Sequence, residues 1–162
     1  MQYYSVKCEA PGGLGPNAIY KYDSKRSYIQ EIEYLDLEFE VWLGGELVEH
    51  VDCYCVSARL WKYLSEHGIR GVSVRDMAVT AGPHVNDAYP NRVIPLFKEL
   101  MLPRTLEGQR AAHWVLNSKS IPDADMFTGL GLPLFITERV RNLLVAYGSS
   151  GAEFDRVSVS GG

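Results

Sequence analysis

One unit of sequence occurs twice in this chain, at positions 80 residues apart. Residues 55–79 and residues 135–159 align without a gap, and five positions are identical: Arg59/Arg139, Leu64/Leu144, Gly68/Gly148, Gly71/Gly151 and Val79/Val159. A common residue makes up about 7% of usage, so a stretch of this length should share only about one or two residues by chance. Self-similarity at a fixed distance constrains the architecture before it says anything about function. We therefore expect a plan of two halves in which both copies form the same elements.

Each copy has the pattern of a capped helix, a glycine turn and a strand. Ser57 and Thr137 are residues that favour the N-cap position, and apolar residues recur behind them at i, i+3 and i+4. Gly68 and Gly148 stand where each helix would end, because glycine tolerates the left-handed conformation that stops a helix. The alternating apolar residues that follow predict a strand. The simplest interpretation is a packing unit without chemistry.

An arginine holds the same place in both copies. Arg59 and Arg139 fall in the first turn of the predicted helices, where a cation is unfavourable because the helix N-terminus carries a partial positive charge. We expect each guanidinium to bind a carboxylate or a neighbouring carbonyl group in a structural role.

The clearest single strand is residues 35–43, in which apolar residues alternate with Asp36, Glu38 and Glu40. A three-residue loop at 44–46 would match its apolar face with that of residues 47–55, which predicts a hairpin. Strands are also expected at 2–8 and 109–117, either strand or helix at 93–102, and loops at 10–18, 80–92 and 118–133. The sequence thus predicts an α+β fold, with a mainly antiparallel sheet and two short helices.

Composition limits the kind of protein. A chain of 162 residues fits one domain with an internal repeat, and an apolar content of 46% is that of a globular protein. The net charge of −4 argues against nucleic acid as a partner, because phosphate binding needs a concentrated basic face. No apolar run is long enough for a membrane span, and the first residues lack the pattern of a signal peptide. Together with an odd number of cysteines, this predicts a cytoplasmic protein.

One short segment concentrates metal-type ligands. His50, Asp52, Cys53 and Cys55 lie close together, and zinc could be held by the histidine and the two cysteines with Cys8 or the distant His84. However, a C-x-C spacing without a second ligand pair is weak support, and two cysteines on one strand face fit buried free thiols. We find no catalytic constellation, so no catalytic residue, metal or cofactor is assigned.

The residues best suited to contact another protein lie in the first 40 positions. Six of the ten tyrosines fall within the first 34 residues, and tyrosine is enriched at protein interfaces because it combines a large apolar area with a polar end. The acidic face of strand 35–43 could steer a basic partner. The predicted partner-binding residues are Asp36, Glu38, Glu40, Tyr22 and Tyr28. Core or edge-strand aromatics and a solvated acidic strand face are the alternative interpretations.

The second half of the chain resembles a known family. The segment Asp125-Met126-Phe127, followed by an apolar strand, Thr137-Glu138-Arg139, a helix, a glycine pair and a strand, is similar to the end of bacterial immunity proteins of polymorphic-toxin systems. The first copy, with PLFKEL at 95–100, resembles the upstream part of that family, so the likeness covers roughly 55–160. The chain lacks the two CxxCG motifs of the double-CxxCG members and is shorter between 100 and 120. Their metal site is therefore not implied here.

The resemblance implies a small antitoxin that binds one cognate toxin domain and blocks it by direct contact, without an enzymatic activity or a cofactor. It implies no oligomeric state. Two alternatives remain: a small enzyme or ligand- or metal-binding domain centred on His50, Cys53 and Cys55 or on His84, and a structural subunit of a larger assembly.

Overall fold

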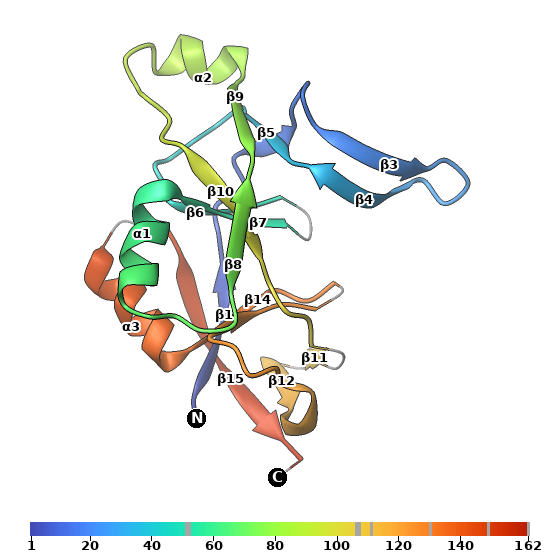
Figure 1. The fold of residues 1–162 in the computed structure, drawn as a ribbon, viewed down its shortest axis with the longest axis vertical. Helices are drawn as coiled ribbons and strands as arrows, with labels where there is room; N and C mark the ends of the chain where they lie inside the picture. The colour runs from blue at the N-terminus through green and yellow to red at the C-terminus, as the bar shows by residue number, and fades with distance from the viewer. Residues whose placement is uncertain (51–52, 106–107, 111, 130, 149, 162) are drawn as a thin grey trace.

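The computed structural model describes the chain except residues 51–52, 106–107, 111, 130, 149 and 162 and the side chains of Tyr28 and Arg110 (Figure 1). The first part forms β1 (Tyr3–Lys7), β2 (Gly12–Leu14), β3 (Ile19–Asp23), β4 (Tyr28–Tyr34), β5 (Asp36–Phe39), β6 (Leu47–His50), β7 (Cys53–Ser57), α1 (Ala58–Glu66), β8 (Ser73–Asp76) and β9 (Ala78–Ala81). The helix α2 (Pro83–Ala88) leads to β10 (Phe97–Met101), β11 (Gly108–Arg110), β12 (Trp114–Asn117), the 3₁₀ helix η1 (Ser118–Ser120), β13 (Met126–Phe127), β14 (Leu134–Thr137), α3 (Glu138–Tyr147) and β15 (Glu153–Ser160). The fold is α+β with mainly antiparallel sheets, as predicted.

The two halves carry the same sheet. In the second half six strands lie in the order β11-β12-β15-β1-β14-β13. The first half has the matching order in two pieces, β2-β5-β9 and β8-β10-β7-β6, because the strand that corresponds to β15 is interrupted at Met77 between β8 and β9. The prediction of two halves is therefore confirmed, and the likeness extends well beyond residues 55–79 and 135–159.

The strand registers agree position by position. Val79 of β9 lies opposite Leu37 in the parallel pair β5–β9. Its repeat partner Val159 lies opposite Leu116 in the parallel pair β12–β15. Two copies that merely shared a helix motif would have no reason to share these neighbours as well, so we describe the chain as a structural duplicate.

The two copies differ by one insertion. Leu14 lies opposite Leu37 in the first copy, and Gly108 lies opposite Leu116 in the second. Leu14 therefore corresponds to a residue 94 positions later, whereas Leu37 corresponds to a residue 79 positions later. The first copy is thus 15 residues longer between these points. The extra length is the hairpin β3–β4, which we call the arm.

The copies also exchange their first strands. β10 lies between β7 and β8 of the first copy, and β1 lies between β14 and β15 of the second copy. In sequence, however, β1 opens the first copy and β10 opens the second. Each copy is consequently completed by a central strand that the other copy supplies.

The predicted helix–glycine–strand unit is present in both copies. The hydroxyl groups of Ser57 and Thr137 cap α1 and α3 by accepting a hydrogen bond from the N–H three residues later, at 3.1 and 3.5 Å. Gly68 and Gly148, with φ of 66° and 87°, have the left-handed conformation expected at the helix ends. The apolar faces of both helices meet in one core cluster that joins the two sheets and includes Leu60, Leu64, Val140 and Leu144.

Both arginines of the repeat bind a buried carboxylate, as predicted. Arg59 Nε lies 2.5 Å from Oε1 of Glu46, and Arg139 Nη1 lies 3.0 Å from Oδ2 of Asp125. Each carboxylate also accepts a hydrogen bond from the hydroxyl group of its N-cap residue, at 2.6 and 3.3 Å. Arg139 binds carbonyl groups in addition, including that of Gly68.

The predicted hairpin between residues 35–43 and 47–55 is wrong. β5 ends at Phe39 and lies between β2 and β9, while β6 pairs with β7. The side chains of Val41 and Leu43 are 56% and 75% exposed, and Trp42 between them is buried. The strand ends because the chain bends there: the N–H of Val41 donates to the carbonyl of Pro11, and Trp42 Nε1 donates to the carbonyl of Gly45 at 2.9 Å. Part of the predicted pairing falls on residues 51–52, outside the described residues.

Some predicted loops hold short elements. The range 80–92 contains α2, which begins with Pro83 at a position where a missing N–H costs nothing. The range 10–18 contains β2, and 118–133 contains η1 and β13; the ambiguous range 93–102 forms β10, and 109–117 divides between β11 and β12. Among the residues that the structure describes, no helix has the length and apolar character needed to cross a membrane.

Candidate protein-binding surface

The arm is the most exposed part of the fold. Its two strands pair only with each other, and Figure 1 shows the hairpin projecting from the side of the molecule. Ile19, Tyr20 and Tyr22 are 55%, 46% and 56% exposed, and none of the arm side chains whose burial is described is fully buried. A surface of exposed aromatic and aliphatic side chains on a projecting hairpin is suited to contact another protein.

Ion pairs stiffen one side of the arm. Lys21 Nζ lies 2.8 Å from a carboxylate oxygen of Glu31 and 3.1 Å from one of Glu33. These contacts raise the pKa of Lys21, and the hydrogen bond to the lysine lowers the pKa of Glu31. All three groups are solvent-exposed, so the pairs contribute little to stability. They leave the arm without a free excess of acidic charge near its base.

The base of the arm is tied to the first copy. Arg75 forms a two-armed ion pair with the buried carboxylate of Glu99, which raises the pKa of the arginine. The same guanidinium donates a hydrogen bond of 2.9 Å to the carbonyl oxygen of Ile32 in β4. The Ile32 side chain packs against the core cluster beneath β5. The arm therefore has an anchored base and an exposed outer part.

One predicted binding residue is a correction. Asp36 is fully buried, and its carboxylate accepts hydrogen bonds from the main-chain and side-chain N–H groups of Asn17, both at 2.9 Å, and from the hydroxyl group of Thr80 at 3.0 Å. The loop 15–17 covers the strand face on which alternation predicted exposure. Asp36 therefore holds the start of the arm in place and is not available to a partner.

The other predicted residues lie where a partner could reach them, with one outside the description. Tyr22 is exposed on the arm. Glu38 is half-buried on β5, and Glu40 is exposed just after that strand. The main chain of Tyr28 pairs with Asp23, but its side chain lies outside the described residues. Sequence reasoning missed Ile19 and Tyr20; their signal is that the second copy has no counterpart of this segment.

The predicted metal-type cluster does not converge. Cys55 is buried in the core beneath β5, Cys53 is half-buried at the edge of the same core, and Cys8 belongs to the other cluster. Burial raises the pKa of both the Cys8 and the Cys55 thiols, which disfavours the thiolate that binds metals. Among the described residues no three histidine, cysteine or acidic side chains are placed to hold a metal ion. Asp52 lies outside the described residues.

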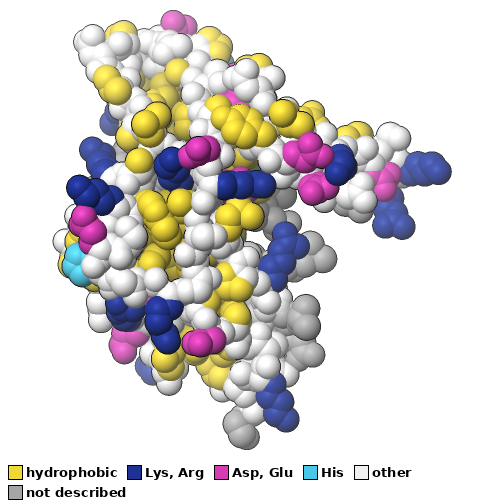
Figure 2. All heavy atoms as spheres, in the orientation of Figure 1, with side chains coloured by type: hydrophobic (Ala, Val, Ile, Leu, Met, Phe, Trp, Pro, Cys, Tyr) yellow, Lys and Arg dark blue, Asp and Glu magenta, His cyan; other side chains and the backbone are white. Residues whose placement is uncertain are grey.

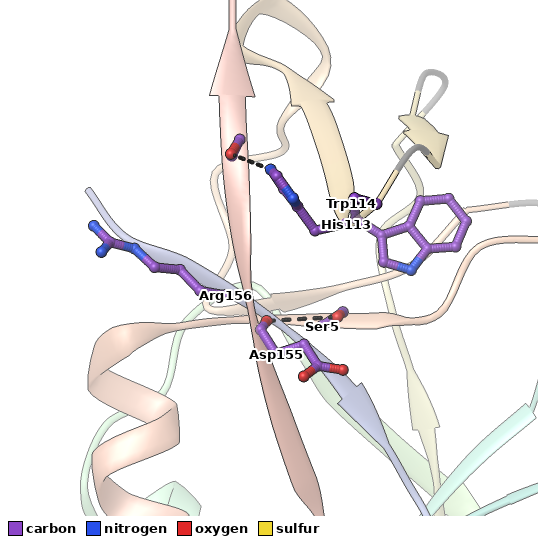
Figure 3. Close-up of a pocket in the computed structure, with 7 residues that line it drawn as sticks. Ser5, His113, Trp114, Asp155 and Arg156 are labelled. Carbon is purple, nitrogen blue, oxygen red and sulfur yellow. Dashed lines mark hydrogen bonds between the residues drawn. The ribbon is translucent and has the colours of Figure 1, made fainter.

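A shallow pocket of about 410 Å³ lies beside β15. Nε2 of His113 lies 2.9 Å from the hydroxyl oxygen of Ser158, a pair that could serve a nucleophilic serine if an acid oriented the histidine. Figure 3 shows the carboxylate of Asp155, which also lines the pocket, turned away from His113, with Arg156 on the opposite side. Both members of the pair are exposed. The arrangement lacks the converging geometry of a catalytic triad.

Comparison with models of known protein families finds no match, and comparison with curated proteins finds no significant one. The family resemblance of the sequence therefore stays a prediction, and the surface must be argued from its own geometry.

Proposed function

We propose that this chain is an immunity protein, an antitoxin that binds a cognate bacterial toxin domain by direct contact, and that the arm is a principal contact surface. The proposal requires a shaped surface and no chemistry. Its partner is a protein, with neither nucleic acid nor a membrane involved, and its place of action is the cytoplasm.

The observation that carries the proposal is the insertion itself. The second copy builds the same sheet without the arm, so the sheet does not need it. The arm exposes Tyr20 and Tyr22 to solvent, although a two-stranded hairpin is only marginally stable by itself. A segment that costs order and contributes little to the core is explained by a contact outside the molecule.

The test is co-expression with the toxin domain encoded beside the gene. We expect the wild-type chain to abolish toxicity and to elute with the toxin domain as one complex. A variant in which two glycines replace residues 19–34 should fold, because no described side chain of the arm is fully buried, but it should not protect. The double variant Tyr20→Ser/Tyr22→Ser should weaken binding about 30-fold or more, as for aromatic anchors of an interface.

The matched control is Val145→Ser, which removes an apolar side chain that is 54% exposed on α3. It should bind the toxin domain as the wild type does. Thermal unfolding of each variant separates a lost contact from a lost fold. Equal protection by the armless variant would remove the arm from the interface, and a chain that neither binds nor protects against the toxin would remove the proposed function.

A further inference from the structure

The outer edge of β9 has no strand beside it. In the described chain β9 pairs with β5 alone. The N–H of Ala78 donates to the carbonyl of Leu35 and that of Gly82 to the carbonyl of Phe39, both at 2.9 Å. Main-chain groups alternate in direction along a strand that pairs on one side. The N–H and C=O of Val79 therefore point away from β5, toward the open side.

An apolar groove of about 470 Å³ runs along this open edge. Met77 and Val79 line one wall, the segment from Ile94 to Leu96 lines the other, and Tyr34 at the base of the arm also contributes. Figure 1 shows β9 between β5 on one side and the connection from α2 to β10 on the other. Leu96 is 79% exposed, and Figure 2 shows hydrophobic side chains open to solvent near the base of the arm.

The second copy shows what covers the same edge there. At the corresponding level of β15, Tyr3 pairs with Val157, and the side-chain amide of Gln2 donates to the carbonyl of Val157 at 3.0 Å. In the first copy the strand that corresponds to β1 stops one step short, because its first pair is Lys98 with Asp76. The occupant of the edge in the duplicate is an extended polypeptide, and its place beside β9 is open.

We infer that the outer edge of β9 binds an extended segment of the partner protein, which adds to the sheet as a further strand and lays apolar side chains into the groove. A peptide main chain alone offers the N–H and C=O groups that the free edge of Val79 can pair with. The lining by Met77, Val79 and Leu96 selects apolar side chains at alternate positions. The inference rests on the proposed function only in naming the toxin domain as the source of the segment.

The test begins with a random peptide library displayed on phage and selected on the full chain. Enriched peptides should be extended sequences with apolar residues at alternate positions, and their binding can be measured by fluorescence polarisation. Val79→Pro removes the outward N–H without removing a bond to β5, and proline is tolerated on an edge strand. We expect it to weaken peptide binding about tenfold, because one hydrogen bond and the close approach of the peptide are lost.

The duplicate supplies the matched control. Val159→Pro makes the same change at the corresponding residue of β15, and it should leave peptide binding unchanged. Leu96→Asp, which puts a charge at an exposed position of the groove wall, should also abolish binding and serves if Val79→Pro lowers the melting temperature. Failure to enrich any peptide, enrichment of an apolar small molecule instead in a parallel screen, or unchanged binding by both groove variants would each overturn the inference.

The two proposals can fail separately. If selected peptides bind at β9 but no toxin domain is neutralised, the proposed function is wrong and strand addition stands. If the toxin domain is neutralised equally by Val79→Pro and no peptide is selected, strand addition is wrong and the function stands.

Discussion

At the scale of single residues, the two copies are organised by buried carboxylates. A buried carboxylate is costly unless charged and polar partners surround it. Glu46 has Arg59, the Ser57 hydroxyl group and the hydroxyl group of Tyr147, which donates at 3.1 Å. Burial, followed by this contact with Glu46, raises the pKa of Tyr147. The arginines of the repeat are therefore explained by structure, and neither copy needs them for catalysis.

Asp36 shows why alternation alone misplaced a side chain. Alternation correctly separates it from Leu37 and Phe39, but it says nothing about what lies over the polar face. In the structure a loop covers that face, and a Cβ atom at Gly15 would lie 2.5 Å from the Asp36 carboxylate. Such a contact is visible only when two segments about twenty residues apart are folded together.

His50 gives a testable pH dependence. Burial lowers its pKa, so the folded chain binds this proton less tightly than the unfolded chain does. As the pH falls from 7 toward 5, the unfolded chain gains a proton that the folded chain resists, and the free energy of unfolding decreases. His50→Gln should reduce this decrease, as measured by urea unfolding at several pH values. His84→Gln, at an exposed position on α2, is the control, and an unchanged profile in His50→Gln would contradict the assignment.

At the scale of elements, the equivalent helix caps should differ in strength. Ser57 accepts from the helix at 3.1 Å and donates to Glu46 at 2.6 Å, whereas the corresponding distances for Thr137 are 3.5 and 3.3 Å. Loss of a cap costs about 1 kcal/mol, and an unsatisfied buried carboxylate adds to it. We expect Ser57→Ala to destabilise by about 2 kcal/mol and Thr137→Ala by about 1 kcal/mol.

Urea unfolding of both cap variants measures this difference. Ser65→Ala is the control, because Ser65 is exposed near the end of α1 and its hydroxyl group donates only to a carbonyl of the same helix. Equal losses in Ser57→Ala and Thr137→Ala would show that the bond to Glu46 adds nothing.

The arm is an element that the sequence identified only in part. Its tyrosines marked the region, because such residues are common at interfaces. Its status as an insertion was hidden, because the copies share recognisable sequence only in the helical unit. Strand pairing keeps its register through hydrogen bonds of the main chain, which any side chain can accompany. The correspondence of Leu14 with Gly108 therefore survives in structure without survival in sequence.

At the scale of the whole molecule, the exchange of β1 and β10 makes the two copies dependent on each other. Each of these strands is central in its sheet and pairs on both sides. Cutting the chain between the copies would leave two fragments that each lack a central strand. Residues such as Val56 and Ile136, which are fully buried, would then lose part of their cover.

We therefore expect fragments 1–91 and 92–162 to be poorly folded when produced separately and to form one folded complex when mixed. Circular dichroism and size-exclusion chromatography of each fragment and of the mixture measure this. A nick between residues 24 and 25, in the turn of the arm, is the control; it leaves both sheets intact and should preserve the fold. A cooperative thermal transition in fragment 92–162 alone would show that β1 is dispensable.

The sequence by itself determined the repeated unit of cap, helix, glycine turn and strand, the role of its arginines and the α+β class. These depend on local rules of capping, periodicity and backbone freedom, which act over a few residues and leave a mark in the amino acids. The tertiary structure decided the pairing of β5, the burial of Asp36, the extent of the duplication, the strand exchange and the open edge of β9. Those features depend on which distant main-chain segments meet, and hydrogen bonds between main chains leave little trace in the side chains that carry the sequence.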